Sequence, residues 1–529
     1  MTNTSEAAKS QATATATDSS PVDAGSGKKR LPPEHVDVLI VGAGLSAIDA
    51  AYHLQKEFPE RTYALLEARE SLGGTWDLFR YPGIRSDSDM YTLGFPFRPW
   101  KGDKAIADGH TILEYLRDTA AEFGIDEHIR YQHRVVRAEW STATSQWTVD
   151  VERTDLPGTI VQFTTNFLFC CSGYYRYDEG YTPEFADIDT FGGTVVHPQH
   201  WPEDLDYADK KVVIIGSGAT AVTLAPSMAD SAAHVSILQR SPTYILSVPA
   251  RDKFSRNMQQ RFPGGFGDSV ARLKNVLLAT GVYQACQRFP TFMKGRIRSL
   301  QTRWLPEGYD IDKHFTPRYN PWDQRMCLVP NGDLFRSIRH GKVDMVTDHI
   351  KSFTTTGIAL ESGEHLDADV VVTATGLNLL AFGGIKLVVD EQPVALSDTM
   401  AYKGMMLSDV PNFAFIVGYT NASWTLKADL VSEYVARLLR YMDDKGFARA
   451  VPRRDPSVVE EPFLDFAAGY VLRSVEAFPR QGSVAPWRLR MNWFRDILAL
   501  RRGSVVESMS FDVAPAGASR GDNLARFTE

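Results

Sequence analysis

Two glycine-rich turns, each set between a strand pattern and a helix pattern, constrain the fold of this chain more than any other feature. The first turn, Gly42-Ala43-Gly44-Leu45-Ser46-Ala47, follows the apolar run 36–41. The second turn, Gly216-Ser217-Gly218-Ala219-Thr220-Ala221, follows the apolar run 212–215. A Gly-x-Gly-x-x-Ala turn in this context is typical of dinucleotide binding. The sequence therefore predicts an α/β protein with two Rossmann-like dinucleotide-binding domains.

The first turn has a residue suited to each task of a dinucleotide site. Gly42 permits the tight turn, Gly44 lets the backbone approach a pyrophosphate, and Ala47 lets the helix lie close to the sheet. The N-H groups at the start of that helix then face the phosphates. Glu67 ends the next strand pattern, where a carboxylate binds the ribose diol. This site is therefore expected to take a nucleotide without a 2′-phosphate.

The second turn differs from the first in the residues that end its second strand. Its expected cofactor-binding residues are Gly216, Gly218, Ala219 and Thr220. The strand pattern 234–238 then ends in Gln239-Arg240-Ser241, without an acid. A carboxylate there would repel a 2′-phosphate, whereas Arg240 offers it a planar, bidentate donor, with Ser241 beside it. The second site should therefore prefer NADPH to NADH.

Three irregular stretches carry further candidate residues. Glycines and a Tyr-Pro-Gly turn predict a loop over residues 73–87, with Gly74, Thr75, Trp76 and Asp87 as candidates. Residues 191–202 read as a linker in which His197 and Trp201 bring a titratable and an amphipathic ring to the place where two cofactors could meet. Residues 319–327 form another expected loop, and its Arg325 stays charged at any relevant pH. The residues alone also allow purely structural roles. Asp87 could be a solvated turn acid, Trp201 a packed core ring and His197 a histidine whose hydrogen bonds are satisfied within the fold.

The stretch 251–312 has a helical pattern, with Val270, Leu273 and Leu277 on one face and many basic residues elsewhere. A basic amphipathic stretch can touch an anionic membrane surface or cover an active site. We expect a helical insertion that helps to shape a substrate cavity rather than a membrane contact.

Two further patterns follow later in the chain. A strand pattern ends at Gly376, and Gly418 precedes a long helix whose expected core face is Leu430, Tyr434, Leu438 and Met442.

Composition narrows the class of protein. A chain of 529 residues is expected to form about three units, and a net charge of −8 gives no reason to expect nucleic-acid binding. Four cysteines make neither a C-x-x-C pair nor a metal cluster, which favours a reducing compartment. The polar first thirty residues are expected to be disordered, and no run of about 18 apolar residues appears. The expected location is the cytoplasm, and no oligomeric state is predicted.

The linker carries a family motif. Its pattern Phe-x-Gly-x-x-x-His-x-x-x-Trp-Pro, over residues 191–202, resembles the fingerprint of Baeyer-Villiger monooxygenases, which are class B flavin monooxygenases. The loop 73–87 resembles a second signature of that family at every defined position. Residues 77–91, 201–207 and 419–427 are similar to the subgroup that activates thioamide prodrugs.

The resemblance implies that FAD binds at the first glycine turn and its βαβ unit, the first module, and that NADPH binds at the second glycine turn and its βαβ unit, the second module. It places the loop 73–87 around the flavin, Asp87 near the isoalloxazine and Arg325 over it. The turn at Gly376 then leads back into the FAD domain, and the helix after Gly418 points toward the flavin pyrimidine ring. The implied boundaries are a disordered extension 1–33, a FAD domain 34–175 and 356–510, a linker 176–210, an NADPH domain 211–355 with its insertion at about 251–312, and a tail 511–529.

The implied reaction inserts one oxygen atom of O2 into ketones through a C4a-peroxyflavin, giving esters or lactones. Oxidation of sulfides and thioamides is the expected second activity. Arg325 would stabilise the anionic oxygen species, with Asp87 orienting it, while His197 and Trp201 would couple domain position to cofactor state. The alternatives are a heteroatom monooxygenase without Baeyer-Villiger activity and a non-catalytic NADPH-sensing flavoprotein. A flavin disulfide reductase is disfavoured because it needs a close redox cysteine pair.

Overall fold

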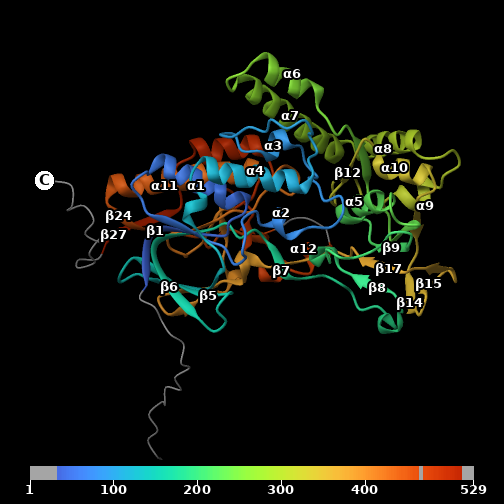
Figure 1. Ribbon diagram of the computed structural model, residues 1–529. Helices are drawn as coiled ribbons and strands as arrows, with labels where there is room; N and C mark the ends of the chain where they lie inside the picture. The colour runs from blue at the N-terminus through green and yellow to red at the C-terminus, as the bar shows by residue number, and fades with distance from the viewer. Residues whose placement is uncertain (1–32, 464–468, 515–529) are drawn as a thin grey trace, which may run out of the picture.

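The computed structural model describes residues 33–463 and 469–514, and two mainly parallel sheets dominate it (Figure 1). The expected two-module α/β fold is confirmed. The predicted disordered extension lies outside the described residues except for its last position, Pro33. The predicted tail begins inside a strand, β27 (Met509–Val513), and its remainder from residue 515 is likewise outside the described part.

The first sheet contains nine strands and holds the first glycine turn. Its order is β20-β19-β4-β5-β6-β1-β2-β3, and β23 also pairs with β6. Ile40 of the central strand β1 lies between Leu65 and Phe169, and all three side chains are buried because helices or further strands cover both faces. The strands are β1 (Glu34–Val41), β2 (Tyr63–Leu66), β3 (Ile129–Arg130), β4 (His133–Ser141), β5 (Gln146–Arg153), β6 (Ile160–Cys170), β19 (Lys386–Val389), β20 (Gln392–Pro393) and β23 (Phe413–Phe415).

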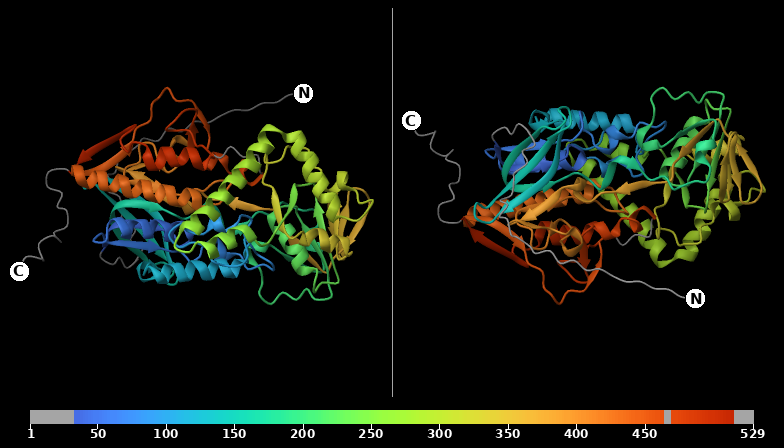
Figure 2. Two further views of the ribbon diagram at one scale, coloured as in Figure 1. Left: turned by 90° about the horizontal axis from the view of Figure 1, so that it is seen from above. Right: turned by 90° about the horizontal axis from the view of Figure 1, so that it is seen from below.

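Three helices cover one face of this sheet: α1 (Leu45–Glu57), α4 (Gly109–Glu122) and α11 (Thr425–Lys445). Helix α11 runs beside α1 although some 370 residues separate them (Figure 2). Its predicted core face, Leu430, Tyr434, Leu438 and Met442, is buried as expected.

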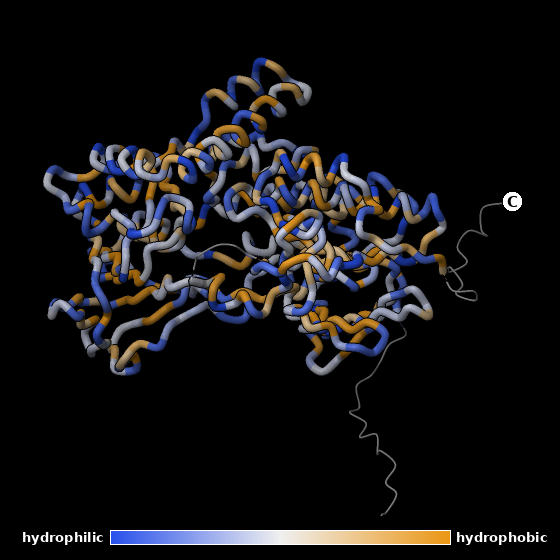
Figure 3. The backbone as a smooth tube through the Cα atoms, turned by 180° about the vertical axis from the view of Figure 1, so that it is seen from behind, coloured by the Kyte–Doolittle hydropathy of each residue, from blue (hydrophilic) through white to orange (hydrophobic). Residues whose placement is uncertain are grey.

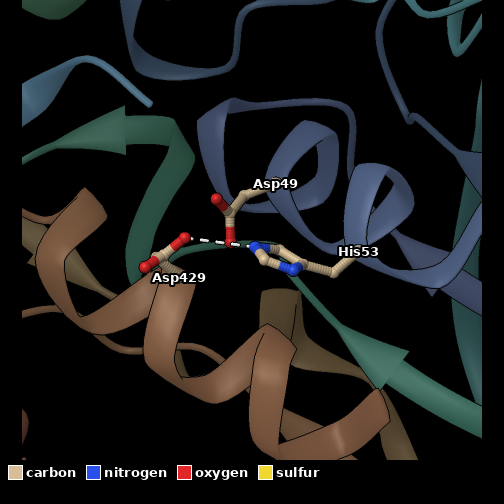
Figure 4. Close-up of side chains that lie close together, drawn as sticks. All are labelled: Asp49, His53 and Asp429. Atoms are coloured by element: carbon tan, nitrogen blue, oxygen red, sulfur yellow. Dashed lines mark hydrogen bonds and ion pairs between the residues drawn. The ribbon is translucent and has the colours of Figure 1, made fainter. Parts of the chain in front are cut away.

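A buried polar cluster also joins α1 to α11 (Figure 4). His53 Nε2 lies 3.1 Å from Asp429 Oδ1, and Ser432 donates a 2.7 Å hydrogen bond to Asp49. Burial raises the pKa of Asp49 to about 7.

The second sheet is fully parallel, in the order β13-β10-β9-β17-β8, and holds the second glycine turn. Its strands are β8 (Thr194–Val196), β9 (Lys211–Ile215), β10 (His234–Gln239), β13 (Val343–Thr347) and β17 (Val370–Thr373). Helices α5 (Ala219–Met228) and α10 (Asp333–Arg339) pack together against one face.

Two strands of this sheet come from segments assigned elsewhere by the sequence. Strand β8 belongs to the predicted linker, and β17 lies beyond residue 356, where the return into the first domain was expected. The three consecutive valines of β17 pair with β9 on one side and β8 on the other, because an apolar parallel strand needs neighbours on both edges. The chain rejoins the first sheet at β19.

Four helices fill the stretch predicted as a helical insertion. They are α6 (Lys253–Arg261), α7 (Phe266–Arg288), α8 (Pro290–Trp304) and α9 (Ile311–Phe315). Helix α6 and the start of α7 stand clear of the rest of the molecule (Figures 1 and 3). No helix in the described ranges is long and apolar enough to cross a bilayer.

Short elements complete the fold. The minor sheets are β7 (Tyr175–Gly180) with β18 (Leu377–Leu379), β11 (Ile245–Val248) with β12 (Cys327–Pro330), β14 (Ile350–Thr354) with β15 (Gly357–Leu360) and β16 (His365–Asp367), β21 (Ala401–Tyr402) with β22 (Met406–Leu407), β24 (Phe447–Pro452) with β27, and β25 (Glu460–Pro462) with β26 (Arg480–Gly482). The short helices are α2 (Thr75–Leu78), α3 (Met90–Leu93), α12 (Gly469–Leu472) and α13 (Trp493–Asp496).

Candidate active site

A cavity of about 530 Å³ lies where the first glycine turn faces the second module. The turn 42–46, Glu67 and the loop residues 73–76 line it from the first module. Ala219 and Thr220 line it from the start of α5 in the second module. Both modules therefore contribute to one site, which we call the first cavity.

The first glycine turn has the backbone geometry that its sequence predicts. Gly42 has a φ of +103°, and a Cβ at this residue would lie 2.9 Å from the carbonyl oxygen of Cys171. Gly44 is the N-cap of α1, and its lack of a side chain leaves the helix start without a side-chain cap. The N-H groups at this end of α1 are thus available to an anion. Ala47 is fully buried where α1 meets the sheet.

Glu67 lies at the end of β2 with its carboxyl group held by the backbone. It accepts hydrogen bonds from the N-H of Ala43 at 2.8 Å and the N-H of Arg69 at 3.0 Å. The residue is only 7% exposed, and burial raises the pKa of its carboxyl group. Each oxygen keeps a lone pair, so this carboxylate can still accept from a diol in the cavity.

The second glycine turn repeats this geometry. Gly216 has a φ of +132°, and a Cβ there would lie 2.3 Å from the carbonyl oxygen of Ala374. Gly218 is the N-cap of α5, again without a side-chain cap. Neither glycine lines the first cavity, whereas Ala219 and Thr220 do.

The end of β10 differs from the end of β2. The side chain of Gln239 is buried and donates to the carbonyl of His314 and the hydroxyl of Thr347, both at 2.8 Å. Arg240 and Ser241 come directly after it and are exposed. A solvent-facing cation therefore occupies the region where the first module has a buried acid.

The loop after β2 forms one wall of the first cavity. Gly74, Thr75 and Trp76 line it, and Thr75 Oγ1 lies 3.4 Å from the hydroxyl of Tyr177. Tyr174, Tyr175 and Tyr177 also line it, and the sequence interpretation missed all three. The available signal was the Tyr-Tyr-Arg-Tyr run at 174–177, which begins four residues after the end of the buried strand β6.

Asp87 and Arg325 form an ion pair, with 2.6 Å between Oδ2 and Nη2. They come from loops that are distant in the sequence, and both are about one-third exposed. Both also line the first cavity and a second cavity of about 630 Å³. The pair therefore lies in the boundary region that the two cavities share.

The second cavity has a mainly apolar lining that also contains charged and polar side chains, among them Asp89, Asp252 and Lys274. The sequence interpretation named Asp87 and Arg325 but not the rest of this lining. Its apolar side chains include Leu246, Val248, Val276, Leu278, Val282, Met326, Leu328, Leu426, Met491 and Trp493. They come from several segments that are far apart in the sequence, so no local pattern could have grouped them.

Two predicted site residues of the linker, His197 and Trp201, lie outside the linings of both cavities. One ring nitrogen of His197, Nε2, lies 3.2 Å from the carbonyl oxygen of Gly376, and the other, Nδ1, accepts from the N-H of Gln199. Burial lowers the pKa of His197. Trp201 packs at the edge of the second module's core. The contact of His197 connects the linker to the turn after β17, and that of Trp201 connects it to the core of the second module.

Gly418 lies close to the first cavity without lining it. A Cβ at Gly418 would meet the ring of Trp424 at 2.4 Å. Trp424 precedes α11, lines the first cavity and donates a 2.8 Å hydrogen bond to the hydroxyl of Ser46 in α1. Gly418 thus lets this ring lie against the backbone.

The cysteines do not form a redox pair. All four are buried and free. The neighbours Cys170 and Cys171 belong to different hydrophobic clusters on opposite faces of the first sheet, and burial raises the pKa of both thiols. This arrangement disfavours disulfide exchange at the first cavity.

Comparisons with known proteins agree on one family. The model of the flavin-binding monooxygenase-like family matches residues 95–406, and that of an NAD(P)-binding Rossmann-like domain matches residues 40–101. The FAD-containing monooxygenase EthA of Mycobacterium tuberculosis is 60% identical over 486 residues, covering 91% of this chain and 99% of that protein.

Two solved structures share the fold. A steroid monooxygenase bound to NADP superposes with a TM-score of 0.71 at 22% identity, covering 90% of this chain and all of that one. OTEMO in complex with FAD and NADP superposes with a TM-score of 0.69 at 19% identity, covering 91% of this chain and all of that one.

Proposed function

We propose that this chain, which belongs to the flavin-binding monooxygenase-like family, inserts one oxygen atom of O2 into ketones to give esters or lactones. The chain is an NADPH-dependent flavin monooxygenase with FAD and NADPH as its cofactors. The observation that carries the ketone proposal is the Asp87–Arg325 ion pair at the boundary between two cavities.

The first module fits FAD. The start of α1 has no side-chain cap, and Gly42 and Gly44 line the first cavity without side chains, which suits a diphosphate. The carboxylate of Glu67 would accept hydrogen bonds from the ribose hydroxyls. Gly74, Thr75 and Trp76 would enclose the flavin, and Ala47 would keep α1 close to the sheet.

The second module fits NADPH. Gly216, Gly218 and the start of α5 at Ala219 and Thr220 would hold the diphosphate. Arg240 and Ser241 would bind the 2′-phosphate, since both are exposed and no acid ends β10. Ala219 and Thr220 also line the first cavity, so a cofactor held at this turn would lie beside the site of the first module.

Reduced FAD supplies the two electrons with which O2 is divided between product and water. The chain's part is to stabilise negative charge on the activated oxygen and to exclude water. Arg325 would provide the fixed positive charge, because a guanidinium stays protonated throughout. Asp87 would hold this guanidinium in place through the 2.6 Å contact, as a positioning residue.

The second cavity would hold the substrate. It shares Asp87 and Arg325 with the first cavity, and its apolar side chains favour uncharged molecules over charged ones. A ketone there would face the same guanidinium. Sulfides and thioamides are also uncharged, so S-oxidation is the expected second activity.

His197 and Trp201 would link the position of the second module to cofactor binding. The contact of His197 with the Gly376 carbonyl supports this role, because Gly376 lies directly between β17 of the second sheet and β18. Trp424, which Gly418 accommodates, would bring the start of α11 to the flavin. We also expect the enzyme to act in the cytoplasm, in keeping with its four free thiols.

The test is product analysis by mass spectrometry, with NADPH, O2 and either one simple ketone or one thioether. Ester formation from the ketone would support Baeyer-Villiger activity. Sulfoxide without any ester would instead support the heteroatom monooxygenase. The variant to compare with the wild type is Arg325→Lys. It keeps the positive charge at position 325 but loses the planar, bidentate donor geometry of the guanidinium.

A further inference from the structure

The helices α6 to α8, which we call the projection after the part of them that stands clear, have an unusual surface. In the described part of the chain, sixteen large hydrophobic residues are exposed, and eight of them lie on this projection. They are Phe254, Phe262, Phe266, Leu273, Leu277, Leu278, Phe289 and Phe292. All five exposed phenylalanines of that set belong to it. Large exposed apolar patches are rare on soluble monomers and mark sites of contact with another protein or a membrane.

The exposed residues of α7 repeat with the helix period. Phe266, Leu273 and Leu277 are seven and four residues apart and so share one face. Phe266 is 63% exposed and Leu277 53% exposed. Ala271 and Val276, by contrast, are buried on the inner side of the same helix. The helix thus has one apolar side turned inward and a second turned outward.

The charge of the projection is opposite to that of the whole molecule. Residues 253–304 contain ten lysines and arginines and one acid, Asp268, whereas the chain carries a net charge of −8. Several of the basic side chains make no ion pair within 4.0 Å in the part of the chain that the structure describes. Among them are Lys253, Arg261, Arg288, Lys294 and Arg296.

The second cavity reaches this surface. Leu278 lines the cavity and is also 57% exposed, and Lys253 lines it and is exposed as well. The cavity therefore opens beside the exposed apolar side chains of α7. Figure 3 shows α6 and the start of α7 standing clear of the rest of the backbone.

We propose that the projection α6–α8 docks on an anionic lipid surface, with its phenylalanines and leucines inserted among the acyl chains and its cations against the headgroups. Aromatic and aliphatic side chains beside unpaired basic ones are the combination that interfacial helices use. A protein of net negative charge is repelled from such a surface, so the local positive charge sets the orientation. Docking brings the mouth of the second cavity to the bilayer, where apolar substrates concentrate.

Docking of this kind does not depend on the ketone activity. It would occur in any flavin monooxygenase with this surface. The sequence pattern alone favoured a cavity-forming insertion, and the exposure of Phe266, Leu277 and Phe292 adds the docking face.

The test is co-sedimentation of the FAD-loaded full chain with sucrose-filled vesicles at low salt. Vesicles of phosphatidylglycerol and phosphatidylcholine in equal parts should pellet the protein, and pure phosphatidylcholine should not. Each lysine or arginine near such a surface strengthens partitioning by about five-fold. The variant Arg288→Glu/Lys294→Glu/Arg296→Glu should therefore lower partitioning by at least about 100-fold.

The matched control reverses three exposed charges outside helices α6 to α8, in the rest of the molecule, which we call the body. It is Lys351→Glu/Lys386→Glu/Arg488→Glu. It has the same net charge as the first variant and should keep partitioning within about three-fold of the wild-type value. A third variant, Phe266→Ser/Leu277→Ser, keeps every charge and should also reduce binding. Equal losses in the body and projection variants would overturn the proposal.

Failure of the wild-type protein to pellet with anionic vesicles would also overturn it. So would a dimer that Phe266→Ser/Leu277→Ser dissociates while vesicle binding is absent, because a second copy would then cover the face. Flavin absorbance and circular dichroism of each variant establish that it is folded. Ester formation without vesicles is measured separately, so loss of docking and loss of catalysis are distinguishable.

Discussion

The two glycine turns have nearly the same backbone but opposite chemistry where their second strands end. Gly42 and Gly216 both have a positive φ, and both lie too close to a carbonyl oxygen for a side chain. The strand after the first turn ends in the buried acid Glu67, whereas the strand after the second leads into the exposed Arg240. The glycine geometry that the two turns share explains the binding of a diphosphate. The different residues at the strand ends, Glu67 and Arg240, explain which ribose each site accepts, one with a free 2′-hydroxyl or one with a 2′-phosphate.

The largest effects are expected from replacing the first glycine of each turn, Gly42 or Gly216, in separate variants. Gly42→Ala should weaken FAD binding by at least roughly 100-fold, because its Cβ would meet the Cys171 carbonyl at 2.9 Å in a strained backbone. Gly216→Ala should keep FAD and lose reduction by NADPH. Flavin absorbance after purification and stopped-flow reduction measure the two effects.

Gly158→Ala is the control for both substitutions. Gly158 also has a positive φ, of +83°, but no atom lies within 4 Å of the position that a Cβ would take there. The substitution should cost only the backbone strain of about 1 kcal/mol and keep both cofactors. If Gly216→Ala lost FAD as readily as Gly42→Ala, the assignment of one cofactor to each turn would fail.

The next effect concerns the second site alone. Arg240→Ala should lower the preference for NADPH over NADH by roughly 30- to 100-fold, since a charge-assisted bidentate contact with the 2′-phosphate is lost. Arg240→Lys should fall between that variant and the wild type. Steady-state kcat/KM with each nucleotide measures the preference, and an unchanged ratio in Arg240→Ala would refute the assignment.

A smaller effect is expected at the first site. Glu67→Gln should weaken FAD binding by about ten-fold, because the amide has one acceptor oxygen where the carboxylate has two. Glu70→Gln, at an exposed position nearby, is the control. Titration of the apoprotein with FAD measures both. Equal affinities in the two variants would show that Glu67 does not contact the ribose.

The smallest effect concerns a difference between α1 and α5, the helices that begin at the two turns: α1 has a buried acid. Helix α1 carries Asp49, which faces His53 of the same helix, Asp429 and Ser432 of α11 and the more distant Arg272 of α7, whereas the buried side of α5 is mainly apolar. Burial raises the pKa of Asp49 to about 7, above its value of 3.8 in an unfolded chain. The favourable contribution of the protonated carboxyl is therefore complete below about pH 4 and lost as the pH rises through about 7.

Asp49→Asn should accordingly raise the melting temperature by a few degrees at pH 8 relative to the wild type, and by less at pH 5. Thermal unfolding of the FAD-loaded protein at both pH values measures this. A difference that is larger at pH 5 would mean that Asp49 is stabilised as a carboxylate.

Local sequence was enough to predict the parts of the site that lie within a few residues of a strand end. Gly42, Gly44, Glu67 and Arg240 have positions fixed by a strand, a turn and a helix, so spacing alone locates them. Asp87 and Arg325 needed the family resemblance, because no local rule brings two distant loops together. Their 2.6 Å contact depends on how the modules pack.

Other features depend on long-range packing that spacing does not encode. The lining of the second cavity comes from separate segments between Asp87 and Trp493. Strand β17 looks like any buried apolar run, and its membership of the second sheet is evident only from its pairing with β8 and β9. Apolar residues occur on both the outward and the inward side of α7, so the sequence could not show that Leu277 is exposed.

The most direct test of the proposed mechanism is the yield of ester per NADPH consumed in Arg325→Ala, with FAD content measured on the same sample. We predict that FAD binding and NADPH oxidation persist while the yield falls by roughly 100-fold or more, with hydrogen peroxide in place of ester, as expected for loss of a fixed charge at the reacting atoms. A yield equal to that of the wild type would contradict the central claim that the Asp87–Arg325 pair makes oxygen insertion work.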